Sequence, residues 1–283
     1  MIRVVQAGDV SQVRNVVLIY HADPQAIGSL VAKACPGAVV ATQVFEPFKL
    51  KYTPQNLPAL AAELAEIQNQ IGGAWQIGSL ILCGFSEGCQ GVRTQVSRGN
   101  VPSAIVCADG LHAAIPLSEA QIAPLKAYCA LARARERVAY LSHTQIDTTG
   151  YLPTKTVTPA VAAFTPAAQT FSDGDATITR EGDLWMFAYP GKDAPAHVRQ
   201  AKEVLPVMAS GALLQAVAQG TSPVILPGGG TPPATPPAGP PGAPPGRPPP
   251  PAGPPPASSS GDGPVAAAVA FFSVLLLGLA FKK

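Results

Sequence analysis

The chain has 283 residues, of which 13% are charged, and a formal net charge of +2. This length suffices for one large α/β domain or two small ones, and the weak charge gives no electrostatic footprint for nucleic acid. Five cysteines without a CxxC spacing and four histidines without an HExxH motif give no argument for a metal site. The composition therefore predicts neither a nucleic-acid partner nor a bound metal.

Residues 1–222 alternate short apolar runs with helical patterns of apolar residues, which is typical of a mostly parallel sheet covered by helices. In chain order, the predicted strands are 2–6, 16–20, 38–45, 77–83, 104–108, 138–141 and 184–189, and the first is a candidate for a sheet edge. The predicted helices are 57–71, 86–96, 118–132 and 197–218, the last interrupted at Pro206. The sequence thus predicts an α/β domain over residues 1–222.

Residues 150–180 interrupt this alternation. They are rich in Thr, Ala and Pro, carry little charge and contain no predicted element. Loops of this length inside a compact domain are usually functional or poorly ordered. We therefore expect an excursion beside a functional site, with decoration of the surface as the alternative.

The C-terminal part of the chain divides into two segments. Residues 223–263, dominated by Pro, Gly, Ala and Ser, predict a disordered and extended linker, because such a composition buries too little apolar surface to fold. Residues 264–283 contain an uncharged run of 17 residues, 265–281, followed by Lys282 and Lys283. A helix of that length spans about 26 Å, which predicts a single-pass C-terminal membrane anchor. The terminal lysines and the absence of a signal peptide point to opposite orientations, so the side of the membrane stays open. A cleaved sorting or lipid-anchor signal is a third alternative, because the small residues 258–261 precede the tail.

One motif carries chemistry. Gly84-Phe85-Ser86-Glu87-Gly88 follows the predicted strand 77–83 and opens the predicted helix 86–96. A strand that turns sharply into a helix needs residues without side chains beside the turn, and the two glycines supply that room. This G-x-S-x-G pattern is a nucleophile elbow, which presents the Ser86 hydroxyl at the start of a helix. There the amide of Glu87 is expected to stabilise an oxyanion.

From this motif and from the order of its elements, the chain over about residues 1–220 resembles the α/β-hydrolase superfamily of serine esterases and lipases. The elbow GFSEG is also similar to the G-Y-S-Q-G of the cutinase-like branch. Residues 16–23 look like the family's third strand running into the oxyanion loop, where His21-Ala22 stands in place of the usual His-Gly. The resemblance implies that the second oxyanion amide comes from Ala22 or Asp23. It also implies a nucleophile after the fifth strand, an acid after the sixth or seventh, and a histidine after the last.

These positions select the remaining catalytic candidates. His197 follows the last predicted strand, so we expect it to be the base that activates Ser86. Asp147 follows the strand 138–141 and is the preferred acid. Asp109, at the end of the strand 104–108, is the substitute, because an Asp-Gly turn also explains its presence there. His112 and His143 are candidates to line the pocket.

The sequence therefore predicts a membrane-tethered serine hydrolase with a monomeric catalytic domain. It would cleave a small-molecule or lipid ester through an acyl-enzyme without any cofactor. Two alternatives remain at this point. One is a hydrolase fold that has lost catalysis and acts as a stalked binding or surface protein. The other is an enzyme of the same class that acts on cell-wall or polysaccharide esters.

Overall fold

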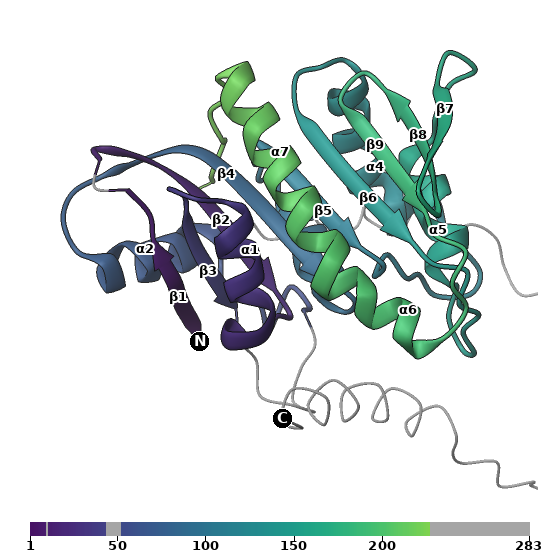
Figure 1. Cartoon of the computed structure of the whole chain (residues 1–283), viewed down its shortest axis with the longest axis horizontal. Helices are drawn as coiled ribbons and strands as arrows, with labels where there is room; N and C mark the ends of the chain where they lie inside the picture. Colours follow the sequence, from purple (N-terminus) through teal and green to yellow (C-terminus); the bar gives the residue numbers. More distant parts are fainter. Residues whose placement is uncertain (10, 44–51, 227–283) are drawn as a thin grey trace, which may run out of the picture.

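The computed structural model describes residues 1–9, 11–43 and 52–226 (Figure 1). The predicted linker from residue 227 onward and the predicted anchor lie outside these residues. Within the described part of the chain, no helix combines the length and the apolar character needed to cross a membrane.

A single sheet forms the centre of the described residues. Its nine strands lie in the order β1-β3-β2-β4-β5-β6-β9-β8-β7. Their bounds are Ile2–Ala7, Val13–Tyr20, Val39–Gln43, Gln76–Phe85, Ala104–Ala108, Val138–His143, Gln169–Asp173, Ala176–Glu181 and Leu184–Ala188 for β1 to β9. The six strands from β3 to β9 run parallel, whereas β1 at one edge and β8 and β7 at the other are antiparallel to their neighbours. The expected α/β architecture with a mostly parallel sheet is confirmed, as is the edge position of the first strand.

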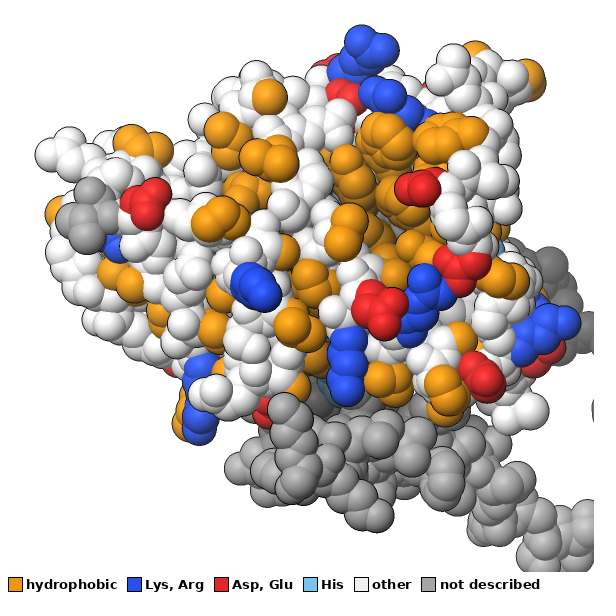
Figure 2. Space-filling view, viewed as in Figure 1, with side chains coloured by type: hydrophobic (Ala, Val, Ile, Leu, Met, Phe, Trp, Pro, Cys, Tyr) orange, Lys and Arg blue, Asp and Glu red, His pale blue; other side chains and the backbone are white. Residues whose placement is uncertain are grey.

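Helices cover both faces of this sheet (Figure 1). They are α1 Ser29–Ala34, α2 Leu60–Ile71, α3 Gly88–Ser97, α4 Glu119–Arg133, α5 Thr154–Ala162, α6 Ala194–Arg199 and α7 Leu205–Gln219, with π-helical turns at η1 Pro24–Gly28 and η2 Gln200–Val204. Successive residues of a strand point to opposite faces, so Leu18 packs in the core beneath α2 to α5 while Ile19 packs in the core beneath α1 and α7. The outer side of α7 exposes Val207 and Leu214. Figure 2 shows that hydrophobic side chains are scattered over this face of the molecule.

Two parts of the chain fold in ways that the sequence analysis missed. Residues 150–180, expected to lack regular structure, contain α5 and the β7–β8 hairpin that extends the sheet. The helix was hidden by threonines and by Pro159, which are poor helix formers. At the end of the domain, the helical segment begins earlier than predicted, at Ala194. Pro206 lies in the first turn of α7, where proline is tolerated because its missing N–H is not needed.

A buried carboxyl group lies between α2 and the strand β2. Glu63 is only 1% exposed. Its Oε2 accepts hydrogen bonds from Tyr20 Oη and from Gln95 Nε2, each at 2.8 Å. Burial raises the pKa of Glu63 to about 8, although the two hydrogen bonds oppose this rise. Folding therefore stabilises the protonated form of this side chain.

This burial predicts a specific pH dependence of stability. Glu63 holds its proton to a higher pH in the folded chain, so its contribution is fully present below about pH 4.5 and is lost as the pH rises toward 8. By pH 7 the loss is on the order of 3 kcal/mol in the free energy of unfolding. Glu63→Gln keeps hydrogen-bonding atoms without titrating, so its stability should fall less steeply with pH.

Urea unfolding of the full chain at several pH values between 5 and 8 would measure this slope. Glu66→Gln, which replaces an exposed carboxylate on the same helix, is the matched control. Parallel stability curves for Glu63→Gln and the wild type would contradict the assignment.

Candidate active site

The turn between β4 and α3 has the geometry expected of a nucleophile elbow. Ser86 adopts a φ of 51°, a left-handed conformation that is costly for a residue with a side chain. Its amide donates to the Ala108 carbonyl at 3.0 Å. A Cβ atom on Gly84 would lie 2.6 Å from the Cys89 nitrogen, and one on Gly88 would lie 2.2 Å from the Tyr20 carbonyl oxygen. The two glycines are therefore required for the close approach of β2, β4 and α3, as the motif predicted.

The pairing of β4 with β5 places Asp109 beside Ser86. Phe85 at the end of β4 is paired with Ala108 at the end of β5, so Ser86 and Asp109, the residues that follow, leave the sheet at the same level. Asp109 is 2% exposed, and its Oδ2 lies 2.7 Å from His197 Nδ1 on α6. The structure thus joins a carboxylate that follows β5 to an imidazole that follows the last strand.

Further hydrogen bonds hold the Asp109 carboxylate. Thr144, directly after β6, donates its amide to Oδ1 at 2.9 Å and its hydroxyl to Oδ2 at 2.8 Å. Thr154, at the start of α5, donates its hydroxyl to Oδ1 at 2.6 Å. Burial alone would raise the pKa of Asp109, but the hydrogen bond and charge of His197, with the two threonines, outweigh it and lower the pKa to about 2. An ionised carboxylate only accepts hydrogen bonds, so Nδ1 of His197 is the donor and Nε2 is left able to accept a proton.

The structure places Asp109, and not the preferred acid Asp147, against His197. Asp147 lines the same pocket, but its Oδ1 pairs with Lys155 Nζ at 2.5 Å and its side chain is 84% exposed. The chain that leaves β6 contributes Thr144 to the carboxylate of Asp109, and by Asp147 it has reached the surface. Asp109, the substitute in the sequence analysis, is the residue that contacts His197.

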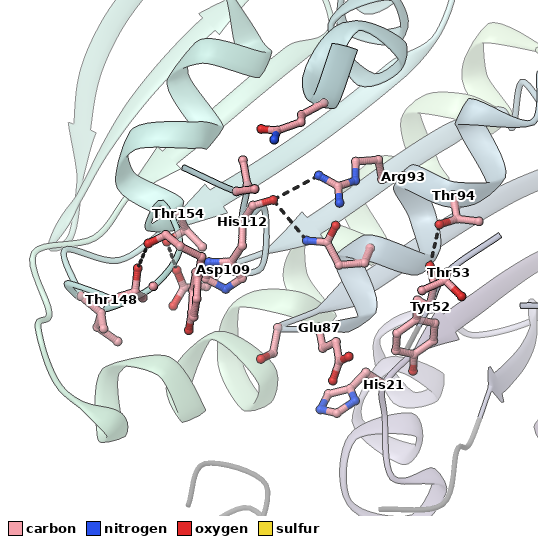
Figure 3. Close-up of a pocket in the computed structure, with 18 of the residues that line it drawn as sticks. His21, Tyr52, Thr53, Glu87, Arg93, Thr94, Asp109, His112, Thr148 and Thr154 are labelled. Carbon is pink, nitrogen blue, oxygen red and sulfur yellow. Dashed lines mark hydrogen bonds between the residues drawn. The ribbon is translucent and has the colours of Figure 1, made fainter. Parts of the chain in front are cut away.

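The elbow serine and the Asp–His pair face a common pocket of about 860 Å³ (Figure 3). Ser86, Asp109 and His197 line it, together with His21, which follows β2. From β2 the chain continues to β3, toward one edge of the sheet, whereas the strands from β4 onward are added toward the other edge. The pocket therefore lies at the point where the strand order reverses, between the ends of β2 and β4. Ligands of open α/β sheets bind at such points, beyond the carboxyl ends of the strands.

The other three histidines occupy different environments. Burial lowers the pKa of His21 and of His112 to about 4, so both pocket residues are neutral at physiological pH. The His112 ring stands edge-on to Tyr151, with 4.8 Å between the ring centroids. His143, expected near the pocket, is instead buried at the end of β6, where its Nδ1 lies 3.2 Å from the Thr144 carbonyl oxygen.

The three oxyanion candidates lie at two chain turns. Glu87 lines the pocket and directly precedes α3. Ala22 and Asp23 follow the pocket residue His21, which has a φ of 60°. The Asp23 carboxylate caps η1 by accepting from the amides of Gln25 and Ala26 at 2.9 and 2.7 Å. The Asp23 side chain therefore stabilises the start of η1.

Several pocket residues escaped the sequence analysis. Tyr151 and Thr154 come from the segment 150–180, so the expectation that this segment lies beside the site agrees with its position. Arg93 lies seven residues after Ser86 on α3, and that helical spacing was a signal that could have found it.

Comparisons with known proteins give little further information. No protein-family model and no curated protein sequence matches the chain. Among solved structures, the chain is similar to TT1662 from Thermus thermophilus, with 14% sequence identity, a TM-score of 0.39, and coverage of 74% of this chain and 90% of that one. What the structure itself establishes is an α/β fold with a mostly parallel sheet, whose pocket holds a serine at a strained turn and an Asp–His pair.

Proposed function

We propose that the chain is a serine hydrolase of the α/β-hydrolase class that cleaves a carboxylic ester through an acyl-enzyme. The observation that carries the proposal is the 2.7 Å contact between Asp109 Oδ2 and His197 Nδ1 in the pocket that Ser86 also lines. The chain order Ser86, Asp109, His197 is the order of nucleophile, acid and base in that class.

In the proposed acylation step, Ser86 Oγ attacks the ester carbonyl carbon and its proton passes to His197 Nε2. Ionised Asp109 accepts a hydrogen bond from the Nδ1–H of His197 and stabilises the imidazolium by its negative charge. The negative charge on the carbonyl oxygen is held by the amide of Glu87 and by that of Ala22 or Asp23. When the tetrahedral intermediate collapses, the bond between the former carbonyl carbon and the alcohol oxygen breaks, and the departing alkoxide takes the proton from His197 Nε2.

Deacylation repeats the sequence with water. His197 Nε2 accepts a proton from a water molecule that attacks the acyl carbon, and the second tetrahedral intermediate forms at the same oxyanion site. Its collapse releases the carboxylic acid and returns the proton to Ser86 Oγ. The cycle uses only side chains and backbone amides of this chain.

Covalent labelling tests this proposal. A fluorophosphonate reacts with a serine only when a base activates the hydroxyl, so the full-length protein should become labelled on the peptide that contains Ser86. Hydrolysis of short p-nitrophenyl esters should accompany the labelling. A folded protein that neither reacts with the probe nor hydrolyses these esters would instead support a catalytically inactive binding protein.

We further propose that the domain is tethered to a membrane through residues 265–281. The uncharged run is the basis of this proposal, because about 26 Å of helix is just enough to cross the apolar core of a bilayer. The full chain should sediment with membranes, whereas a chain truncated after Pro256 should stay in the supernatant. Recovery of the full chain in the supernatant would count against the tether.

A further inference from the structure

One face of α3 forms a wall of the pocket. Four side chains of this helix line the pocket together with Ser86: Gln90, Arg93, Thr94 and Ser97. Their spacing of three and four residues places them along one side of the helix. At 1.5 Å per residue, Arg93 is about 8 Å along the helix axis from Gly88, the first residue of α3, which follows Ser86 by two residues. The His112 carbonyl oxygen accepts hydrogen bonds from Arg93 Nη1 and also from Nε2 of Gln90, which lies nearer to Ser86 along the chain.

Arg93 is a cation without an anionic partner among the described residues. Its Nη1 donates to the His112 carbonyl oxygen at 3.1 Å (Figure 3), and none of the ion pairs in the described part of the chain includes it. It is also the one Lys or Arg among the described residues that line the pocket. Arg93 is half-buried, and this burial lowers the pKa of its guanidinium because the charged form loses solvent.

The acidic groups of the pocket do not compensate this charge. Asp109 is engaged by His197 and by two threonines, and Asp147 is paired with Lys155. Glu87 lies six residues before Arg93, at the catalytic end of the helix, which is about 9 Å away along the axis. A partly desolvated guanidinium with unused donors is a site for a planar anion, because its N–H groups match the two oxygens of a carboxylate.

We infer that Arg93 binds a carboxylate of the substrate, so that the preferred esters are anionic and carry that group at the far end of a medium-length chain. This inference rests on the proposed hydrolase function, and it names the substrate class of the same pocket. The scissile ester would lie at Ser86 and the carboxylate beside Arg93, further along α3. Selectivity would come from the loss that a neutral ester suffers when it leaves the guanidinium unpaired.

Two pairs of esters test the inference. On the acyl side, p-nitrophenyl hemisuberate is compared with p-nitrophenyl octanoate. On the alcohol side, 8-butyryloxyoctanoate is compared with octyl butyrate. The readout is the ratio of kcat/KM for the charged ester to that for its neutral partner. In at least one pair, Arg93→Gln should lower this ratio by about tenfold or more, chiefly through a higher KM for the charged ester.

Three comparisons make this result specific. Arg93→Lys keeps the charge but loses the paired donors, so its ratio should fall between those of Arg93→Gln and the wild type. Lys202→Gln removes one positive charge from an exposed residue outside the pocket and should keep the wild-type ratio. Thermal unfolding shows whether Arg93→Gln folds, and Arg93→Lys decides the matter if it does not.

An unchanged ratio for the Arg93 variants in both ester pairs would overturn the inference, while labelling of Ser86 in the same preparations would leave the hydrolase function standing. If the wild type shows neither labelling nor hydrolysis, the proposed function fails. Calorimetry with ethyl hydrogen suberate then still decides whether Arg93 binds a carboxylate, since tighter binding to wild type than to Arg93→Gln supports it and equal binding refutes it.

Discussion

Replacing Ser86 with alanine should abolish both ester hydrolysis and labelling by a fluorophosphonate. The substitution removes the proposed nucleophile, and losses of this kind are on the order of 10⁶ in kcat. Alanine adds no bulk at a position with a φ of 51°, so the turn between β4 and α3 should be retained. Initial rates with a p-nitrophenyl ester measure the loss, and circular dichroism checks the fold. Undiminished hydrolysis by folded Ser86→Ala would remove the serine mechanism.

The base gives a companion variant of the same experiment. His197→Ala should lose a factor of about 10³ or more in kcat, because Ser86 then lacks an acceptor for its proton. Combining the two substitutions should cost little more than Ser86→Ala alone, since residues that act as a unit are not additive. His112→Ala is the comparator: it removes a neutral imidazole from the same pocket and should cost at least tenfold less than His197→Ala.

The local parts of the site were readable from the sequence. An apolar run followed by Gly84, Ser86 and Gly88 predicts a strand, a tight turn and a helix, and all three form because nearby residues determine them. The strand 104–108 was predicted with its observed bounds for the same reason. Apolar residues that recur every second residue indicate a strand with one buried face, and those that recur every three or four residues indicate a helix with one buried face. Such spacing can be read from neighbouring residues alone.

The choice of acid depends on contacts that are far apart in the sequence. Asp109 is separated by 35 residues from Thr144, by 45 from Thr154 and by 88 from His197, and these partners decide that it is buried and ionised. Locally it is an Asp before Gly, a pair that also marks ordinary turns, and its φ of 45° agrees with that. Asp147 matched the expected position after a strand equally well. The fold distinguishes them, because Thr144, Thr154 and His197 surround Asp109 whereas the loop after β6 brings Asp147 to the surface.

Asp109→Asn should therefore cause a large kinetic loss, because Asp109 and not Asp147 is the carboxylate that contacts His197. Asparagine keeps the shape of the side chain, and its oxygen can still accept from the Thr144 amide and the Thr154 hydroxyl. Its amide nitrogen would then face His197 Nδ1 and donate to it, which moves the imidazole hydrogen to Nε2. In that tautomer Nε2 is unable to take the proton of Ser86, and the imidazolium has also lost its counter-charge.

The expected cost of Asp109→Asn is a factor of about 10³–10⁴ in kcat, or roughly 4–5 kcal/mol, with little change in KM. Because folding lowers the pKa of Asp109, the ionised group also contributes on the order of 2 kcal/mol to stability at neutral pH, a contribution lost as the pH falls through about 2. Kinetics must therefore be measured where urea unfolding shows the variant to be folded. Asp147→Asn is the matched control, since it removes the same charge from an exposed partner of Lys155 and should change kcat no more than a few-fold. A large loss in Asp147→Asn beside a small one in Asp109→Asn would return the role of the acid to Asp147.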